Sequence, residues 1–251
     1  MSERKRAICW DLDNTLGRFG KVYYDLHGKK PPASESSILL RAGIKKLLTT
    51  LNNEGFTHYI TSSGGDLYIQ EAVKRSGLDE FIGKDNIFPV ELLTNPRSGG
   101  KNYQYPEERF CQEEGEHQHI MLVVGDGPGD QPQDKENLVF IKVSCGFEYS
   151  SEIFKRVIDV LWEEGNGSFV NGFRAIFQKA ERIRTESRGS SEYSSRRVEV
   201  KRYELSDGII LELEFSGAFD YEKGKKIEGV FPQVDIISAD KFVCEPEKVE
   251  G

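Results

Sequence analysis

The chain has 251 residues and a formal net charge of −8 at pH 7. This length suits one α/β domain with an extension, or two small domains, and the acidic balance argues against a generic binder of nucleic acid or membrane surfaces. Its cysteines show neither metal-ligand spacing nor a disulfide pattern, and its charged start predicts no signal peptide, so we expect a cytoplasmic protein. No apolar run is long enough to predict a membrane span.

Apolar runs alternate with helical patterns along the first 150 residues. The pattern predicts a loop over 17–36, strands at 7–13, 57–61, 87–92, 119–124 and 138–143, and helices at 38–53, 66–75 and 106–112. This alternation is typical of an α/β fold, a three-layer, Rossmann-like parallel sheet with helices on both faces.

The remainder of the chain changes character twice. Two helices are predicted at 151–164 and 168–186, and the serine-rich stretch 187–195 is typical of a polar linker. Asp207-Gly208 then separates two β-rich runs, which predicts a hairpin, and 234–237 adds a further strand. We therefore expect a catalytic core over 1–165, a helix and linker over 166–195, and a small β-rich extension over 196–251. The extension is too small to bury much core alone, so we expect it to dock on the core or on a partner.

Polar residues stand where three of the predicted strands end. Asp11 and Asp13 stand at the carboxyl end of the first strand, Thr61 ends the second, and Asp126 follows the strand 119–124, with Asp130 four residues further on. The carboxyl ends of parallel strands form the edge at which α/β sheets bind ligands. Two close carboxylates are costly without a shared proton or a cation, and Mg²⁺ prefers oxygen ligands.

In this order, over roughly residues 7 to 145, the motifs resemble the haloacid dehalogenase-like (HAD) superfamily of phosphohydrolases. The stretch Asp11-Leu12-Asp13-Asn14-Thr15-Leu16 matches the first motif of that family, and Thr61 matches the second. Lys101 is the candidate for the third motif, with Lys84 as its rival. Gly125-Asp126 together with Asp130 matches the fourth.

The resemblance implies a Mg²⁺-dependent phosphatase that acts through an aspartyl-phosphate intermediate. Asp11 would be the nucleophile and Asp13 the general acid and base. The phosphate would be bound by Thr61, Ser62 and Lys101. The metal would be held by the side chains of Asp11 and Asp126 and the backbone carbonyl of Asp13, with support from Asp130.

Short spacings between the motifs imply a core with no cap domain, or a minimal one. Such a site would be open to bulky substrates, or it would be closed by another part of the chain or by a second subunit. The substrate stays open among nucleotides, sugar phosphates, phosphoproteins and nucleic-acid ends, although nothing in the sequence indicates nucleic acid, and the oligomeric state is not legible. A phosphotransferase would use the same chemistry. The alternative function is an interaction module, with the core as a scaffold and the β-rich tail as the binding segment.

Overall fold

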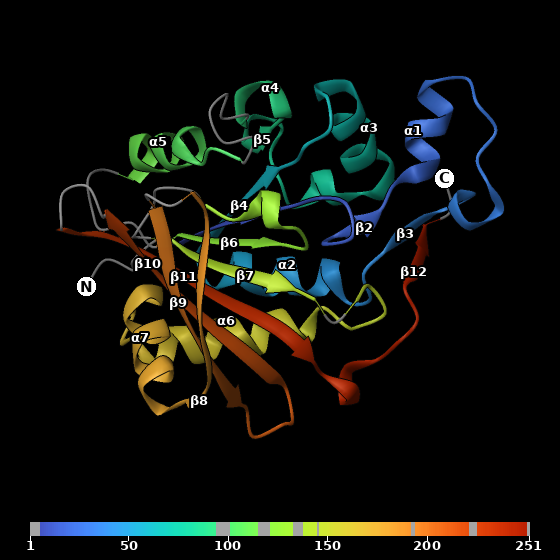
Figure 1. Cartoon of the computed structure of the whole chain (residues 1–251). Coiled ribbons are helices and arrows are strands. Elements are labelled where there is room, and N and C mark those ends of the chain that lie inside the picture. The colour runs from blue at the N-terminus through green and yellow to red at the C-terminus, as the bar shows by residue number, and fades with distance from the viewer. Residues whose placement is uncertain are drawn as a thin grey trace.

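One large sheet runs through the computed structural model, which describes residues 6–93, 101–114, 121–132, 138–144, 146–191, 194–220 and 225–249. Over these residues it has nine strands in the order β5-β4-β1-β6-β7-β11-β10-β9-β8 (Figure 1). The first five in chain order are β1 Arg6–Trp10, β4 Phe56–Thr61, β5 Ile87–Phe88, β6 Met121–Gly125 and β7 Val139–Val143. These five pair in parallel, as predicted.

Apolar residues cover both faces of the central strand, which explains its unbroken apolar sequence. In β1, Ile8 and Trp10 belong to the larger of two cores, whereas Ala7 and Cys9 belong to the smaller. The alternation follows from the two-residue period of a strand. Because every side chain of β1 from Ala7 onward is fully buried, the residue that follows Trp10 is placed with little freedom.

Helices lie on both faces of this sheet. They are α2 Ile44–Asn53, α3 Asp66–Ser76, α4 Val90–Leu93, α5 Gln104–Glu114, α6 Glu152–Glu164 and α7 Phe169–Lys179. Figure 1 shows α3, α4 and α5 above the sheet and α6 and α7 beneath it. The predicted α/β class with three layers is confirmed. No helix in the described ranges is both long enough and apolar enough to cross a membrane.

Some element boundaries differ from the prediction. The expected loop 17–36 contains β2 Gly17–Arg18 and α1 Gly20–Leu26. The helix expected over 38–53 starts as β3 Ile38–Leu40, because these residues pair with strands on both sides. The strand expected over 87–92 ends at Phe88, since Pro89 has no N–H to continue the ladder. Short 3₁₀ turns cover Ala33–Glu35, Leu78–Glu80, Lys84–Asn86, Pro128–Asp130 and Asp240–Phe242.

The β-rich extension continues the core sheet. The strands of this part of the chain are β8 Glu181–Ser191, which precedes the bounds predicted for the extension, and β9 Ser194–Glu204, β10 Ile210–Asp220 and β11 Lys225–Ser238. The hairpin predicted at Asp207-Gly208 joins β9 and β10. β11 pairs antiparallel with β10 and parallel with β7, so it fuses the two halves of the sheet. The expectation that the extension docks on the core is met by strand pairing.

The prediction of a polar linker over 187–195 was wrong, because the residues of this stretch that the structure describes belong to β8 and β9. The helix expected over 168–186 ends at Lys179. The serine-rich and charged sequence did not predict β8, because β8 is an edge strand and lacks the apolar pattern of a buried one. Such a strand is held by backbone pairing on one side and accepts exposed polar side chains. The side chains of 181–185 are all exposed.

The end of the described chain returns to the first part of the molecule. β12 Glu247–Val249 pairs with β3, and β3 with β2, in a separate three-stranded sheet. Glu247 also accepts a hydrogen bond from the backbone N–H of Gly43 at 2.7 Å. The C-terminal segment therefore braces the region that follows the first motif.

Candidate active site

Neighbouring strands β4, β1 and β6 bring three of the predicted residues to one edge of the sheet. Asp11 follows β1 directly, Thr61 is the last residue of β4, and Asp126 follows β6. The backbone N–H of Asp11 donates to the carbonyl of Val124 at 2.8 Å, which holds the first acidic residue against β6. Parallel pairing alone thus explains why residues distant in sequence meet here.

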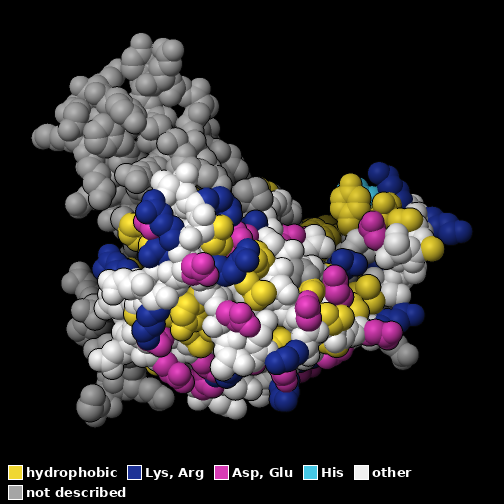
Figure 2. Space-filling view, turned by 60° about the horizontal axis from the view of Figure 1, so that its bottom comes forward, with side chains coloured by type: hydrophobic (Ala, Val, Ile, Leu, Met, Phe, Trp, Pro, Cys, Tyr) yellow, Lys and Arg dark blue, Asp and Glu magenta, His cyan; other side chains and the backbone are white. Residues whose placement is uncertain are grey.

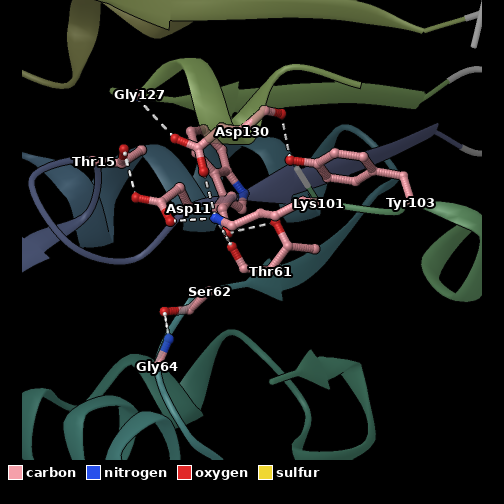
Figure 3. Close-up of polar contacts among 10 residues, drawn as sticks. Asp11, Thr15, Thr61, Ser62, Gly64, Lys101, Tyr103, Gly127 and Asp130 are labelled. Atoms are coloured by element: carbon pink, nitrogen blue, oxygen red, sulfur yellow. Dashed lines mark hydrogen bonds and ion pairs between the residues drawn. The ribbon is translucent and has the colours of Figure 1, made fainter. Parts of the chain in front are cut away.

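Lys101 lies in the middle of this group (Figure 3). Its Nζ is 2.6 Å from Oδ1 of Asp11 and 2.5 Å from Oδ1 of Asp130. It also donates to the carbonyl of Thr61 at 2.6 Å. Asp11, Lys101 and Asp130 are only 6%, 7% and 5% exposed, so these contacts lie in a poorly solvated place. The rival Lys84 is exposed in its 3₁₀ turn, and Lys101 is the lysine that meets the aspartates.

The loop after β6 turns Asp130 back toward the sheet. A Cβ on Gly125 would lie 2.5 Å from Oδ2 of Asp130, so only glycine leaves room for this carboxylate. The backbone N–H of Gly127 donates to Oδ2 of Asp130 at 3.0 Å, and the hydroxyl of Tyr103 donates to its carbonyl at 2.6 Å. Tyr103 was missed by sequence reasoning, because it lies in a polar stretch whose packing no periodicity marks.

Three carboxylates face a single ammonium group. Oxygens of Asp11, Asp126 and Asp130 all lie within 4.8 Å of one another. Burial raises the pKa of Asp11 to about 7, Lys101 opposes the shift only in part, and Asp130 adds to it. Burial also raises the pKa of Asp126, with Asp130 as the next cause. Burial opposes the charge on Lys101, yet Asp11 and Asp130 outweigh it and raise the pKa of this lysine, which stays protonated.

This arrangement fits a divalent cation. Three ionised carboxylates and one ammonium group leave two negative charges in a largely buried cluster, and hard oxygen donors suit Mg²⁺. Oδ1 of Asp11 contacts Lys101, whereas its Oδ2 accepts a long hydrogen bond, 3.3 Å, from the hydroxyl of Thr15. That oxygen and the half-buried carboxylate of Asp126 are the donors best able to reach a metal.

Asp13 stands apart from the three clustered carboxylates. Its Oδ1 accepts a hydrogen bond from the hydroxyl of Tyr68 at 2.7 Å. Burial raises the pKa of Asp13, and the bond from Tyr68 opposes this shift. Tyr68 was not predicted as a site residue, because it lies in the first turn of α3 and resembles an ordinary amphipathic helix position.

The hydroxyls predicted to bind phosphate lie at the same edge. Thr61 is fully buried, and its Oγ1 donates weakly to the carbonyl of Trp10 at 3.4 Å. The hydroxyl of Ser62 accepts from the backbone N–H of Gly64 at 3.1 Å, which shapes the turn before α3 (Figure 3). The turn therefore presents backbone N–H groups near a helix N-terminus, an arrangement that suits an anion.

Arg41 holds the backbone of the first motif through hydrogen bonds from its side chain. It is fully buried, and its guanidinium donates to the carbonyls of Asn14 at 2.7 Å and Thr15 at 2.8 Å. It also donates to the carbonyls of Gly146 at 3.0 Å and Tyr149 at 2.9 Å. Arg41 thus ties the loop after Asp13 to the loop after β7. Nothing in the sequence distinguished this arginine from a surface residue.

A cleft of about 1220 Å³ opens beside Asp13. One wall comes from α1 and the loop after it, and the other from the start of α3. Its lining includes Asp13, three tyrosines (Tyr23, Tyr24 and Tyr68) and the turn Ser63-Gly64-Gly65. The prediction of a minimal cap or none stays a prediction, and the wall beside Asp13 in the described residues is formed by α1 and the loop after it.

Solved structures with a related fold carry phosphatase and hydrolase names. One is a predicted phosphoglycolate phosphatase from Haemophilus somnus, 13% identical, covering 57% of this chain and 87% of its own, with a TM-score of 0.42. Another is a haloacid dehalogenase-like hydrolase from Streptococcus pneumoniae, 18% identical, with coverages of 59% and 88% and a TM-score of 0.37. A phosphoserine phosphatase in a phospho-aspartyl intermediate analogue state is 17% identical, with coverages of 61% and 90% and a TM-score of 0.40. No family model and no curated protein matches the sequence.

Proposed function

We propose that this protein is a Mg²⁺-dependent phosphatase of the HAD-like superfamily, which hydrolyses phosphomonoesters through an aspartyl-phosphate on Asp11. The observation that supports this most strongly is the meeting of Asp11, Lys101 and Asp130 at the edge where β4, β1 and β6 end. The same edge carries Thr61 and Asp126, so each motif of the sequence resemblance converges on one place.

The first step forms the covalent intermediate. A carboxylate oxygen of Asp11 attacks phosphorus while the bond from phosphorus to the leaving oxygen breaks. Asp13 gives its proton to that leaving oxygen. The raised pKa of Asp13 suits this role, because it keeps more of the acid form available than an exposed aspartate would.

The second step returns the enzyme to its starting state. Asp13, now ionised, takes a proton from water as the water oxygen attacks phosphorus. The bond between Asp11 and phosphorus breaks, and inorganic phosphate leaves. The hydrogen bond from Tyr68 holds the carboxylate of Asp13 in one orientation through both steps.

Binding of the phosphoryl group is assigned to Lys101, Thr61 and Ser62, together with the backbone N–H groups of the turn before α3. Lys101 favours the ionised form of Asp11 and places a positive charge beside the incoming phosphate. Mg²⁺ would be held by the side chains of Asp11 and Asp126 and the backbone carbonyl of Asp13, with Asp130 in support. When bound, it offsets the repulsion between these carboxylates and the phosphoryl oxygens.

Hydrolysis of 4-nitrophenyl phosphate by the wild type and Asp11→Asn, each with Mg²⁺ and with chelator, tests the proposal. We expect turnover that needs Mg²⁺ and falls by a factor on the order of 10⁴ or more in Asp11→Asn. Asp79→Asn is the matched control, because Asp79 is exposed in a 3₁₀ turn. Turnover retained by a folded Asp11→Asn would overturn the assignment. A folded wild type inactive on this and every alkyl ester tried would favour the interaction module.

A further inference from the structure

The wall of the cleft beside Asp13 is unusually aromatic. Tyr23 is 45% exposed, and its ring lies 4.3 Å from that of His27, 5.7 Å from that of Tyr24 and 6.5 Å from that of Tyr68, centroid to centroid. Leu67, on the opposite wall, is 66% exposed. Hydrophobic side chains gather at the right of Figure 2, on the side where Figure 1 places α1. The cleft therefore offers aromatic and apolar surface next to the acid.

We infer that this cleft binds the leaving group of the substrate, and that it selects phosphate monoesters of a phenol, of the phosphotyrosine type. The inference rests on the proposed function, because it takes Asp13 as the group that protonates the leaving oxygen. It goes further in assigning α1 and the start of α3 as the part of the chain that recognises the substrate.

The contact between Tyr68 and Asp13 indicates where such a ring would lie. The hydroxyl of Tyr68 donates to Oδ1 of Asp13, as a departing phenol does once it has received its proton. In a phenol that donates to Asp13, the ring is separated from the carboxylate by the phenol oxygen and one hydrogen bond, as the ring of Tyr68 is. The ring of the substrate would thus lie at the depth of Tyr68 and within the aromatic wall that Tyr23 extends.

The charges in the cleft favour an aryl ester over a nucleotide. The charged residues that line it are of both signs: Arg18, Asp66 and Glu35 in addition to Asp13. A mixed lining does not offer the cluster of cations that a nucleoside polyphosphate requires. A nucleotide would also place its ribose, and not its base, against the aromatic surface nearest Asp13.

One ion pair joins the two walls of the cleft, and a second lies within α1. Asp25 on α1 accepts from Arg75 on α3 at 2.7 Å and from Lys21 at 2.9 Å. The contact between Asp25 and Arg75 links α1 to α3 directly, so the two walls that would enclose a ring touch each other.

The test compares kcat/KM for O-phospho-L-tyrosine and O-phospho-L-serine in three proteins, the wild type, Tyr23→Ala and Tyr23→Leu. The ratio of kcat/KM for the two esters is compared among the proteins, because the difference in intrinsic reactivity between the esters is the same in each. We expect the tyrosine-to-serine ratio to fall about tenfold in Tyr23→Ala, equivalent to about 1.4 kcal/mol. It should fall less in Tyr23→Leu, which keeps apolar area without the ring. Tyr105→Ala is the control, because Tyr105 is 47% exposed on α5 and does not line the cleft.

A second readout separates this inference from the proposed function. Calorimetric titration with phenylphosphonate and methylphosphonate measures binding without turnover. Tighter binding of phenylphosphonate that weakens in Tyr23→Ala supports the aryl site, even if no ester is hydrolysed and the proposed function fails. Hydrolysis of both esters with a ratio unchanged in Tyr23→Ala overturns the aryl site and leaves the phosphatase standing. A phosphotyrosine peptide added to the series shows whether the ester is accepted within a polypeptide.

Discussion

The side chains of this site make short, buried contacts, and the negative charges of the carboxylates outnumber the positive charge of the one lysine among them. Lys101 bridges Asp11 and Asp130, yet one ammonium group cannot neutralise the three clustered carboxylates. The pKa of Asp11 is raised to about 7 by burial first, with the neighbouring carboxylates adding to it. At the scale of single residues, the site therefore gains more from a divalent cation than from any further hydrogen bond.

This imbalance predicts that Mg²⁺ stabilises the fold. At a Mg²⁺ concentration about 100 times its Kd, the free energy of unfolding should rise by about 2.7 kcal/mol in the wild type. Asp126→Asn removes one ligand, so it should need more Mg²⁺ for the same gain, while its stability without metal is unchanged or higher because repulsion is relieved. Thermal unfolding across a Mg²⁺ series measures both effects, with Asp79→Asn as the control. Equal Mg²⁺ dependence in Asp126→Asn would contradict this ligand.

Tyr68→Phe tests the hydrogen bond to Asp13. The variant keeps the aromatic ring in the cleft and loses only the hydroxyl that orients the carboxylate at 2.7 Å. A hydrogen bond to a charged group contributes about 1.5–3 kcal/mol, so kcat should fall about tenfold or more, with KM changed far less. Steady-state kinetics on an aryl phosphate measures the split, and Tyr105→Phe controls for loss of an exposed hydroxyl. A rise in KM with kcat intact would show that Tyr68 binds substrate only.

At the scale of elements, the packing of β4 against α2 depends on a neutral histidine. His58 accepts from the indole N–H of Trp10 at 3.0 Å through Nδ1, and its Nε2 lies 3.3 Å from the carbonyl of Leu48 on α2. These partners fit the tautomer with hydrogen on Nε2, which donates to Leu48. Protonation of Nδ1 would place its N–H opposite the indole N–H of Trp10, and two donors cannot form a hydrogen bond. The contact therefore persists only while His58 is neutral.

This contact predicts loss of stability in acid. Burial lowers the pKa of His58 from 6.5 to about 4, and the bond to Leu48 opposes the shift in part. Because the folded-state pKa is depressed, the stabilisation is fully present above pH 6.5 and is lost as the pH falls through 4. The loss should be on the order of 3 kcal/mol over this window.

The comparison of His58→Gln with the wild type measures this loss. Glutamine can keep both hydrogen bonds and does not titrate, so its unfolding free energy should fall less between pH 6.5 and 4. Carboxylates titrate in both proteins, and the difference between the two pH curves isolates His58. The exposed His27→Gln should follow the wild-type curve. Parallel curves for His58→Gln and the wild type would refute the assignment.

On the scale of the whole molecule, β11 joins the strands of the core and the strands of the C-terminal part into one sheet, although the sequence predicts two separate parts. It pairs with β7 of the first half of the chain on one side and with β10 on the other. Val234 and Ile236 are fully buried within the same core as β1 and α6. The C-terminal segment then returns through β12 to brace β3 and β2 near the first motif. The two halves should consequently unfold together.

Ile236→Ala tests this coupling. Truncation of a fully buried isoleucine should cost about 2–5 kcal/mol. Denaturant unfolding followed by both circular dichroism and tryptophan fluorescence should give one shared transition at a lower midpoint, since Trp10 lies in β1, far along the chain from Ile236. The control is Val243→Ala, at a position 55% exposed, which should change stability by less than about 0.5 kcal/mol. Two separated transitions would mean that the halves are independent.

The sequence by itself determined the local part of this protein. Strand periods, helix spacing and the polar residues after β1, β4 and β6 are written into neighbouring residues, so the α/β class and Asp11, Asp13, Thr61, Asp126 and Asp130 as residues of one sheet edge could be predicted. Parallel pairing then requires those residues to converge.

Only the tertiary structure decided which distant groups meet them. Lys101 rather than Lys84 reaches Asp11 because its own backbone N–H donates to the carbonyl of Gly129 at 3.0 Å, which holds this lysine at the sheet edge. Tyr68, Tyr103 and Arg41 act through contacts that no local pattern marks. β11 likewise owes its place in the core sheet to β7, a partner far along the chain, and β8 is held by backbone pairing with β9 that outweighs its polar local sequence. Interactions between neighbours in sequence leave a periodic signature, whereas pairing and burial between distant segments depend on the folded chain as a whole.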